Sequence, residues 1–231
     1  MAKFGKKYRA ILKDAPKQPV SVEEAIKFIK AHPAAKFDET LDVAFCLGTN
    51  CVRSDSPVRG TVKLPAGSGK NVKVLVFAGG EHADQAKAAG ADYVGMDDLI
   101  EKITKDGWCD FDVAIATIEA MKNVRKCARV LGPRGLMPNP KTGTVTDDPA
   151  TAVKEAKAGK VDFRMDKTGN CCVIAGKLSF EADKLAQNVK AVVSAVNAAK
   201  PATVKGQFIK TLTLCSTMGP GVPCILSMDA E

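Results

Sequence analysis

The stretch Val72-Lys73-Val74-Leu75-Val76-Phe77-Ala78-Gly79-Gly80 decides how the 231-residue chain is organised. Its nearly continuous apolar run, which ends at a pair of glycines, is typical of a β-strand that is buried on both faces. Strands that alternate with helices indicate a small α/β domain built on a parallel sheet. That alternation follows downstream, with helix-like segments at 83–89, 97–104 and 118–130 and strand-like segments at 93–94 and 111–116.

The two flanks of this α/β region have a different sequence pattern, which is typical of antiparallel strands combined with helices. Upstream, Ser21 and Glu24 form a capping box at a helix start, and apolar residues alternate with polar ones along 41–47, as in a half-buried strand. Downstream, two short strands flank a hairpin-type turn at 166–170. An amphipathic helix over 182–196 then precedes a last strand at 208–214.

Because the two flanks share this antiparallel α+β pattern, the simplest architecture is a single domain that the α/β region interrupts. The predicted fold class is therefore α+β, with a discontinuous antiparallel α+β domain and an inserted α/β second domain. The discontinuous domain comprises residues 1–67 and 160–231. The insert, residues 68–159, is expected to hold a Rossmann-like parallel sheet, and a linker rich in Gly and Pro at 64–70 leads into it.

Charge is distributed unevenly between these two domains. The chain has a net charge of +8, with 34 Lys and Arg against 26 Asp and Glu. Residues 1–67 contain 12 cations and 7 anions, residues 160–231 contain 9 and 6, and the insert contains 13 of each. The whole net charge therefore lies on the discontinuous domain, which is the better candidate for an anion-binding face.

The composition excludes several other classes of protein. No apolar run approaches the roughly 18 residues of a membrane span, and the basic N-terminus has no apolar stretch behind it, so it is no signal peptide. A cytoplasmic location is expected. The eight cysteines contain no C-x-x-C spacing and are interpreted as reduced thiols, so neither a metal nor a cofactor is expected.

The most distinctive segment is Leu131-Gly132-Pro133-Arg134-Gly135-Leu136-Met137-Pro138-Asn139-Pro140-Lys141-Thr142-Gly143-Thr144-Val145. Its glycines and prolines predict a rigid, irregular loop. It resembles the signature of the ribosomal protein L one family, of the bacterial type, and the resemblance extends over essentially the whole chain. Further matching motifs are Lys36-Phe37-Asp38-Glu39-Thr40, Phe163-Arg164 with Asp166-Lys167, and Ser216-Thr217-Met218-Gly219-Pro220-Gly221.

The resemblance implies a two-domain fold and a structural role in the large ribosomal subunit. Members of the family bind large-subunit ribosomal RNA and build the mobile side stalk, which is involved in tRNA release and touches tRNA transiently at the exit side. Bacterial members also repress translation of their own mRNA through an RNA mimic of that site. The chain is accordingly expected to have no membrane partner, no enzymatic activity and a monomeric state outside the ribosome.

The family's RNA contacts lie on the discontinuous domain. The cations among them suit phosphates, the hydroxyl groups suit the ribose 2′-hydroxyl that distinguishes RNA from DNA, and the aromatic ring suits a base or sugar. Asp166 is expected to orient an arginine or to accept from a hydroxyl or base amine. Carried over residue by residue, the contacts are Lys36, Phe37, Thr40, Arg164, Asp166, Lys167, Thr168, Ser216, Thr217, Met218 and Gly219.

Three rival interpretations stay open at the level of sequence. Taken alone, Phe37 is more often a core aromatic than an RNA contact. The glycines after the strand at 72–77 are also found in nucleotide-binding enzymes, although neither G-x-G-x-x-G nor the phosphate-binding loop pattern is present. A free RNA-binding repressor without a ribosomal role would use the same surface.

Overall fold

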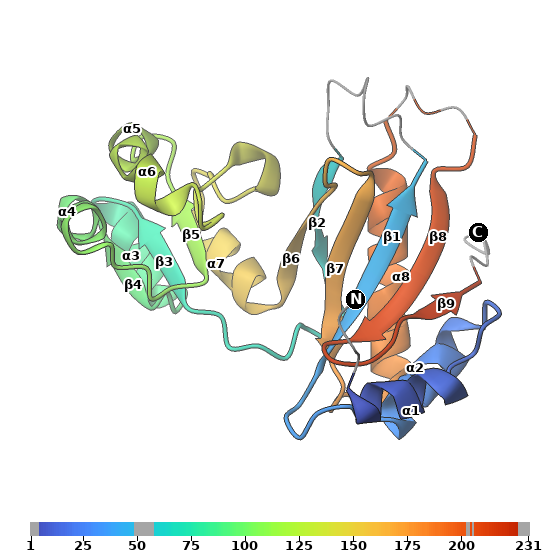
Figure 1. Ribbon diagram of the computed structural model, residues 1–231. Helices are drawn as coiled ribbons and strands as arrows, with labels where there is room; N and C mark the ends of the chain where they lie inside the picture. Colours follow the sequence, from blue (N-terminus) through green and yellow to red (C-terminus); the bar gives the residue numbers. More distant parts are fainter. Residues whose placement is uncertain (1–4, 49–57, 202–203, 205, 226–231) are drawn as a thin grey trace. The chain divides into compact units, whose positions relative to one another are not determined.

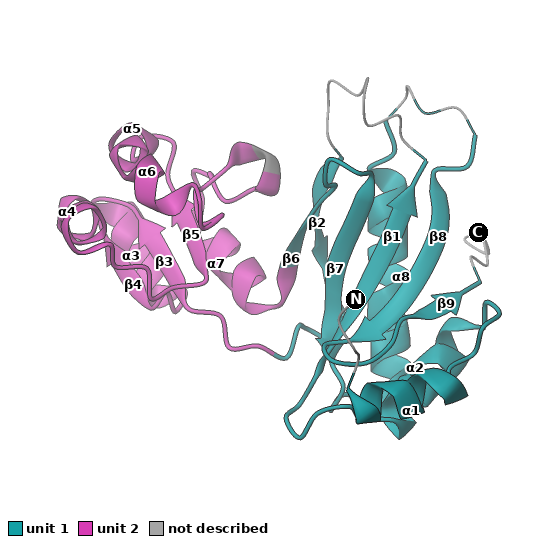
Figure 2. Cartoon of the chain, in the orientation of Figure 1, with its two compact units in different colours: residues 1–69, 161–231 teal, residues 70–160 magenta. Residues whose placement is uncertain are grey.

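A computed structural model describes residues 5–48, 58–201, 204 and 206–225 of the chain. The chain divides into two compact units, which we call the discontinuous unit (Met1–Gly69 and Val161–Glu231) and the inserted unit (Lys70–Lys160). Figure 2 shows them in different colours. One unit holds an antiparallel sheet and the other a separate parallel sheet, so the predicted α+β fold class is confirmed.

The discontinuous unit is built on a four-stranded sheet in the order β7-β1-β8-β9. All neighbours in this sheet are antiparallel, and β1 pairs with β7 on one side and β8 on the other. The sheet therefore combines chain from before and after the insert. Its strands are β1 (Thr40–Leu47), β7 (Asn170–Lys177), β8 (Ile209–Ser216) and β9 (Val222–Cys224).

Three helices accompany this sheet, namely α1 (Lys6–Asp14), α2 (Val22–Ala31) and α8 (Ala182–Ala198). The capping box at Ser21 and Glu24 forms as predicted, with both reciprocal hydrogen bonds present. Alternate residues of β1 are buried, and they join apolar residues of α2 and α8 in one core. In the view of Figure 1, α8 lies behind the sheet. The opposite face of the sheet is thus left as a candidate binding surface.

A separate strand pair, β2 (Arg59–Lys63) and β6 (Lys160–Arg164), lies where the chain leaves and re-enters the discontinuous unit. Gly60 on β2 has no room for a side chain, because an added Cβ would lie 2.6 Å from the Phe163 ring. The two strands therefore pack closely through a glycine and an aromatic ring.

The buried amide of Asn188 on α8 fixes the segment that leads into the insert. Its Nδ2 donates to the carbonyls of Gly67 (3.1 Å) and Ala175 (2.7 Å), and its Oδ1 accepts from the Ala66 amide (3.0 Å). Asn188 and Ala175 are completely buried, so these bonds satisfy the side-chain amide and a backbone carbonyl that water cannot reach. The linker is therefore ordered as far as the last residues of the discontinuous unit.

The inserted unit has a three-stranded parallel sheet in the order β4-β3-β5. The decisive strand β3 (Val74–Phe77) lies in the centre and all four of its residues are buried, as the apolar run predicted. The other elements are β4 (Tyr93–Gly95), β5 (Val113–Ala116), α3 (Glu81–Ala88), α4 (Asp97–Asp106), α5 (Met121–Val124), η1 (Arg125–Cys127), α6 (Ala128–Leu131), η2 (Pro140–Thr142) and α7 (Pro149–Lys157).

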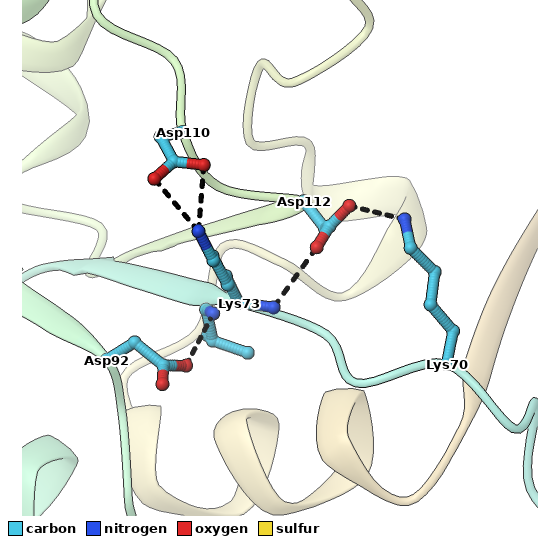
Figure 3. Close-up of polar contacts among 6 residues, drawn as sticks. Lys70, Lys73, Asp92, Asp110 and Asp112 are labelled. Carbon is cyan, nitrogen blue, oxygen red and sulfur yellow. Dashed lines mark hydrogen bonds and ion pairs between the residues drawn. The ribbon is translucent and has the colours of Figure 1, made fainter.

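Carboxylates hold the start of β3 in place (Figure 3). Asp112 accepts from the Lys73 amide (3.1 Å) and pairs with Lys70, while Asp92 accepts from the Val74 amide (2.9 Å). The Lys73 ammonium donates to both oxygens of Asp110 at 2.8 Å. The first residues of the insert are thereby tied to the loops that precede β4 and β5.

The predicted helix over 118–130 is not one regular helix. Residues 121–131 form the three short segments α5, η1 and α6, because a 3₁₀ turn interrupts the α-helical hydrogen bonding. The predicted rigid loop after it is held by the Thr144 hydroxyl, which accepts from the Asn139 amide at 2.8 Å. Backbone bonds between Ala116 and the segment Thr144–Thr146 then bring the loop to β5.

We expect Asn188→Ala to destabilise the protein, because it removes the bond to the buried Ala175 carbonyl and the bonds to the half-buried Ala66 amide and Gly67 carbonyl. An unsatisfied buried group costs about 1–3 kcal/mol. Asn197→Ala is the matched control, since Asn197 is exposed on the same helix and gains the same helix propensity. Thermal denaturation of both variants should show a clear loss for the first alone, and equal melting temperatures would contradict the role of Asn188.

Candidate RNA-binding surface

The buried carboxylate of Glu39 joins two segments that are far apart in sequence. One oxygen accepts from the Ala35 amide (2.5 Å) and the other from the Met218 amide (3.4 Å), across 179 positions. The Ser216 hydroxyl also bonds to this carboxylate. Glu39 is only 2% exposed. It therefore locks the loop before β1 to the turn after β8, and we call residues 35–40 and 216–219 the Glu39 cluster.

The hydrogen bonds decide the charge state of Glu39. Burial raises the pKa of a carboxyl group, but bonds from the Ser216 hydroxyl and from the amides of Ala35, Met218 and Ala34 outweigh it. The pKa of Glu39 consequently lies below its ordinary value, and the group is ionised at neutral pH. An ionised acceptor makes stronger hydrogen bonds than a neutral one, which strengthens the connection between the loop before β1 and the turn after β8.

Backbone and hydroxyl groups add a second connection between the same segments. The Thr40 amide donates to the Thr217 hydroxyl oxygen (3.0 Å), and the Thr217 amide donates to the Thr40 carbonyl (3.2 Å). Gly219 closes the turn by donating to the Ser216 carbonyl at 3.2 Å. A Cβ at Gly219 would lie 2.4 Å from the Ser216 hydroxyl oxygen, so only glycine fits beside Glu39.

Two large apolar side chains project from this frame into solvent. Phe37 is 57% exposed and Met218 is 58% exposed. Lys36, the neighbour of Phe37 in the sequence, is also exposed. The loop that carries Phe37 is held on its other side by Asp38, which accepts from the Ser179 amide (3.1 Å) and hydroxyl (2.9 Å). Phe37 is therefore not a core residue, and the rival interpretation of that side chain is wrong.

The remaining predicted residues lie on the turn between β6 and β7, which we call the Asp166 turn (164–170). Asp166 Oδ1 accepts from the Thr168 amide (2.9 Å), the Thr168 hydroxyl (2.8 Å) and the Asn170 amide (2.8 Å). The Thr168 hydroxyl bond and the Asn170 amide bond are the main causes that lower the pKa of Asp166. Arg164 and Lys167 are exposed on either side of it.

The structure separates the predicted residues into these two groups. Thr40 and Ser216 lie at the start of β1 and the end of β8, whereas Leu47 at the far end of β1 donates to the Gly169 carbonyl at 2.9 Å. Seven steps of about 3.3–3.4 Å along β1 place the two groups roughly 23 Å apart. Figure 1 shows them at opposite ends of the same sheet.

The open face of the sheet runs between the two groups. Because side chains alternate along a strand, the residues of β1 that are not in the core point to this face together with their cross-strand neighbours. Its residues are Asp42, Ala44 and Cys46 from β1, Cys172 and Ile174 from β7, and Thr211, Thr213 and Cys215 from β8.

Two thiols of this face, those of Cys172 and Cys215, have raised pKa values. Burial raises the pKa of both Cys172 and Cys215, and the nearby Asp42 carboxylate raises each further. Both thiols are therefore protonated and uncharged at neutral pH. The seven cysteines among the described residues are free.

Several residues that organise this surface were missed in the sequence. Glu39 and Asp38 belong to the quoted motif 36–40, yet their roles depend on partners more than 135 positions away, at Met218 and Ser179. Lys177 was also missed. Its ammonium donates to the Asp38 carbonyl and the Thr40 hydroxyl, both at 3.1 Å. The one signal in the sequence was the pair of carboxylates that follows Phe37 within an otherwise basic motif.

No described helix of the chain is long and apolar enough to span a membrane. The described residues also contain no group of His, Cys, Asp and Glu side chains suited to a metal ion.

A rigid frame that presents cations, hydroxyl groups and apolar side chains on a basic unit is characteristic of a binding protein. The family model described as the ribosomal protein L1p/L10e family matches residues 29–220. The chain is 52% identical over 220 residues to the large ribosomal subunit protein uL1 of Solibacter usitatus, covering 95% of this chain and 93% of the relative. It is 49% identical over 232 residues to uL1 of Fervidobacterium nodosum, covering 100% and 99%.

The class is thus that of ribosomal proteins. Within it, the chain belongs to the ribosomal protein L1p/L10e family. Members of this family are structural proteins and not enzymes, so the glycines after β3 serve the fold of the inserted unit and the enzyme interpretation is set aside. A ribosomal, and hence cytoplasmic, location follows from the family.

We expect Glu39→Gln to weaken the connection between the two segments of the Glu39 cluster and to change how the free energy of unfolding depends on pH. A folded-state pKa below the unfolded value of about 4.3 means that Glu39 stabilises the native state above that pH, and that this contribution is lost as pH falls through the folded pKa. Glutamine cannot accept at both positions, so we expect a loss of about 1–3 kcal/mol at pH 7.

The measurement is the free energy of unfolding between pH 7 and pH 3. The difference between wild type and Glu39→Gln should be largest near pH 7 and shrink in acid. Glu119→Gln, which removes an exposed carboxylate in the inserted unit, serves as the control. A constant difference in the free energy of unfolding across this range would show that the charge of Glu39 does not stabilise the Glu39 cluster.

Proposed function

We propose that this chain is a structural constituent of the large ribosomal subunit that binds ribosomal RNA through its discontinuous domain, residues 1–67 and 160–231. The observation that carries the proposal is the Glu39 cluster, in which a buried carboxylate holds Phe37 and Met218 exposed on two rigidly joined segments. Exposing two large apolar side chains to water is unfavourable unless a partner covers them. The localised charge of +8 makes an RNA partner the best match.

The chemistry of the two groups favours different parts of RNA. Lys36, Arg164 and Lys167 suit phosphates at the two ends of the sheet, and Thr40 and Thr217 suit ribose hydroxyl groups. Ser216 is 5% exposed and bonds to Glu39, so we assign it a positioning role. Thr168 and Asp166 are bonded to each other within their turn, so they present Lys167 and accept from donors on the RNA.

The relatives in Solibacter usitatus and Fervidobacterium nodosum carry the name large ribosomal subunit protein uL1. On this similarity we assign the same subunit to this chain. We further propose that it forms the mobile side stalk, meets tRNA transiently at the exit side during release, and represses its own mRNA through the same surface. A monomer outside the ribosome fits a surface that is reserved for RNA.

Sedimentation of cell extract in moderate salt is the first test of the assignment. The chain should travel with large subunits, and its recovery in the unbound fraction alone would contradict the assignment.

Binding to the ribosomal RNA fragment should be RNA-selective and salt-dependent. Each phosphate that is neutralised adds roughly 0.7–0.9 to the slope of log affinity against log salt. The hydroxyl-rich cluster supports preference for RNA, because DNA lacks the 2′-hydroxyl. Titrations with the RNA fragment and with DNA of the same sequence should give weaker binding for DNA, and equal affinities would refute RNA selectivity.

Phe37→Ala and Met218→Ala should each weaken RNA binding by about ten- to a hundredfold, equivalent to 1–3 kcal/mol per contact. Both side chains are neutral, so the salt slope should stay the same. Both are more than half exposed, so the melting temperature should change little.

Leu12→Ala is the matched control, because Leu12 is 45% exposed on α1 of the same unit but outside the Glu39 cluster. It should leave RNA affinity unchanged. If Phe37→Ala lowered the melting temperature strongly while the folded fraction bound RNA normally, Phe37 would not belong to the surface.

A further inference from the structure

The insert, residues 68–159, carries a one-sided distribution of charge that its net charge of zero conceals. Residues 120–146 contain six Lys and Arg and no Asp or Glu, whereas the rest of 68–159 contains seven cations and 13 anions. The segment therefore carries +6 and the remainder of the insert carries −6. The proposed RNA-binding surface of the discontinuous unit does not use any of these cations.

Four of these cations lie along one side of consecutive helical turns. Lys122, Arg125, Lys126 and Arg129 follow the spacing i, i+3, i+4 and i+7 through α5, η1 and α6, which brings side chains to one face. The other face is buried and contributes Val124, Cys127 and Leu131 to the core of the unit. All four cations are exposed. We call them the cationic stripe.

The stripe differs from several other cations of the insert, which have carboxylate partners. Lys105 pairs with Glu101 on α4 at 2.6 Å, Lys87 lies 3.7 Å from Asp84 on α3, and Lys73 pairs with Asp110 at 2.8 Å. Within the part of the chain that the structure describes, none of the four stripe cations has a carboxylate within 4.0 Å. Their spacing instead places like charges three and four residues apart, which destabilises a helix.

Charge complementarity and composition identify the partner. Half of the stripe is arginine, whose planar guanidinium suits phosphate oxygens. Proteins that hold single strands use aromatic platforms for the bases. No Phe, Tyr or Trp occurs between Phe111 and Phe163. The stripe is thus equipped to contact phosphates and not to stack on bases, which favours a base-paired RNA helix whose bases are already stacked.

We propose that the cationic stripe is a second RNA-binding surface, which contacts the phosphate backbone of a double-helical RNA without reading its sequence. It is independent of the Glu39 cluster and goes beyond the proposed function, because it gives the inserted unit a binding role of its own. Arg134 extends the surface from the turn after α6, where the Leu136 amide donates back to the Leu131 carbonyl at 3.1 Å.

The test uses the full chain and a mixed-sequence RNA duplex longer than the roughly 16 base pairs that a double-stranded RNA domain covers. The stripe variant is Arg125→Gln/Lys126→Gln/Arg129→Gln. The matched control is Lys73→Gln/Lys87→Gln/Lys105→Gln, which removes the same charge from the same unit at cations that already have carboxylate partners. Affinity for the duplex is measured over a range of salt concentrations.

The stripe variant should lower the salt slope by about 0.7–0.9 for each phosphate that it no longer neutralises, and the control should leave the slope near its original value. The melting temperature of the stripe variant should stay the same or rise, because repulsion between like charges is relieved. Equal slopes for the stripe variant and wild type, or an equal decrease in the control, would overturn the proposal. A stripe that binds an acidic protein would give the first of these results.

A third variant, Lys36→Gln/Lys167→Gln, separates this proposal from the function of the discontinuous unit. If both surfaces bind RNA independently, combining it with the stripe variant should add the two decreases in slope. If the stripe variant lowers affinity for the duplex but Lys36→Gln/Lys167→Gln leaves affinity for the ribosomal RNA fragment unchanged, the function proposed for the discontinuous unit fails while the stripe stands. If only Lys36→Gln/Lys167→Gln has an effect, the stripe proposal fails.

Discussion

The carboxylate of Glu39 is the interaction on which the proposed RNA surface depends. It is almost completely buried, and that position is tolerable only because a hydroxyl group and backbone amides surround it. The same bonds fix the two segments that expose Phe37 and Met218. Since side chains held in place before binding lose less entropy when the partner arrives, a rigid frame favours affinity as well as position.

The interrupted topology is the second constraint. β1 precedes the insert and lies between β7 and β8, which both follow it, so the discontinuous unit cannot complete its sheet until the chain has passed through the insert. The amide of Asn188 holds the outgoing chain on one unit, and Asp112 holds its continuation on the other. The two units consequently keep separate cores while sharing one continuous chain.

Charge is used differently in the two units. The discontinuous domain, residues 1–67 and 160–231, combines a net charge of +8 with neutral side chains that supply shape and hydroxyl groups. In the insert, five of the seven cations outside residues 120–146 pair with nearby carboxylates, whereas the helical turns 121–131 keep their cations uncompensated. A neutral total therefore does not mean a neutral surface, and only the placement of charges shows where an anionic partner would be attracted.

The sequence by itself determined the features that depend on neighbouring residues. The apolar run of β3, the capping box at Ser21 and the alternation along β1 each have a local period or spacing that specifies one kind of element. The motifs indicated the family. The 3₁₀ turn within 121–131 was not visible, because a short change of hydrogen bonding leaves the apolar spacing almost unaltered.

The tertiary structure decided how residues were brought together. It joined Thr40 to Thr217, moved Lys167 to the far end of the sheet and made Glu39 the centre of the surface. These outcomes depend on strand register between segments more than 120 residues apart, and no local pattern in the chain contains that information.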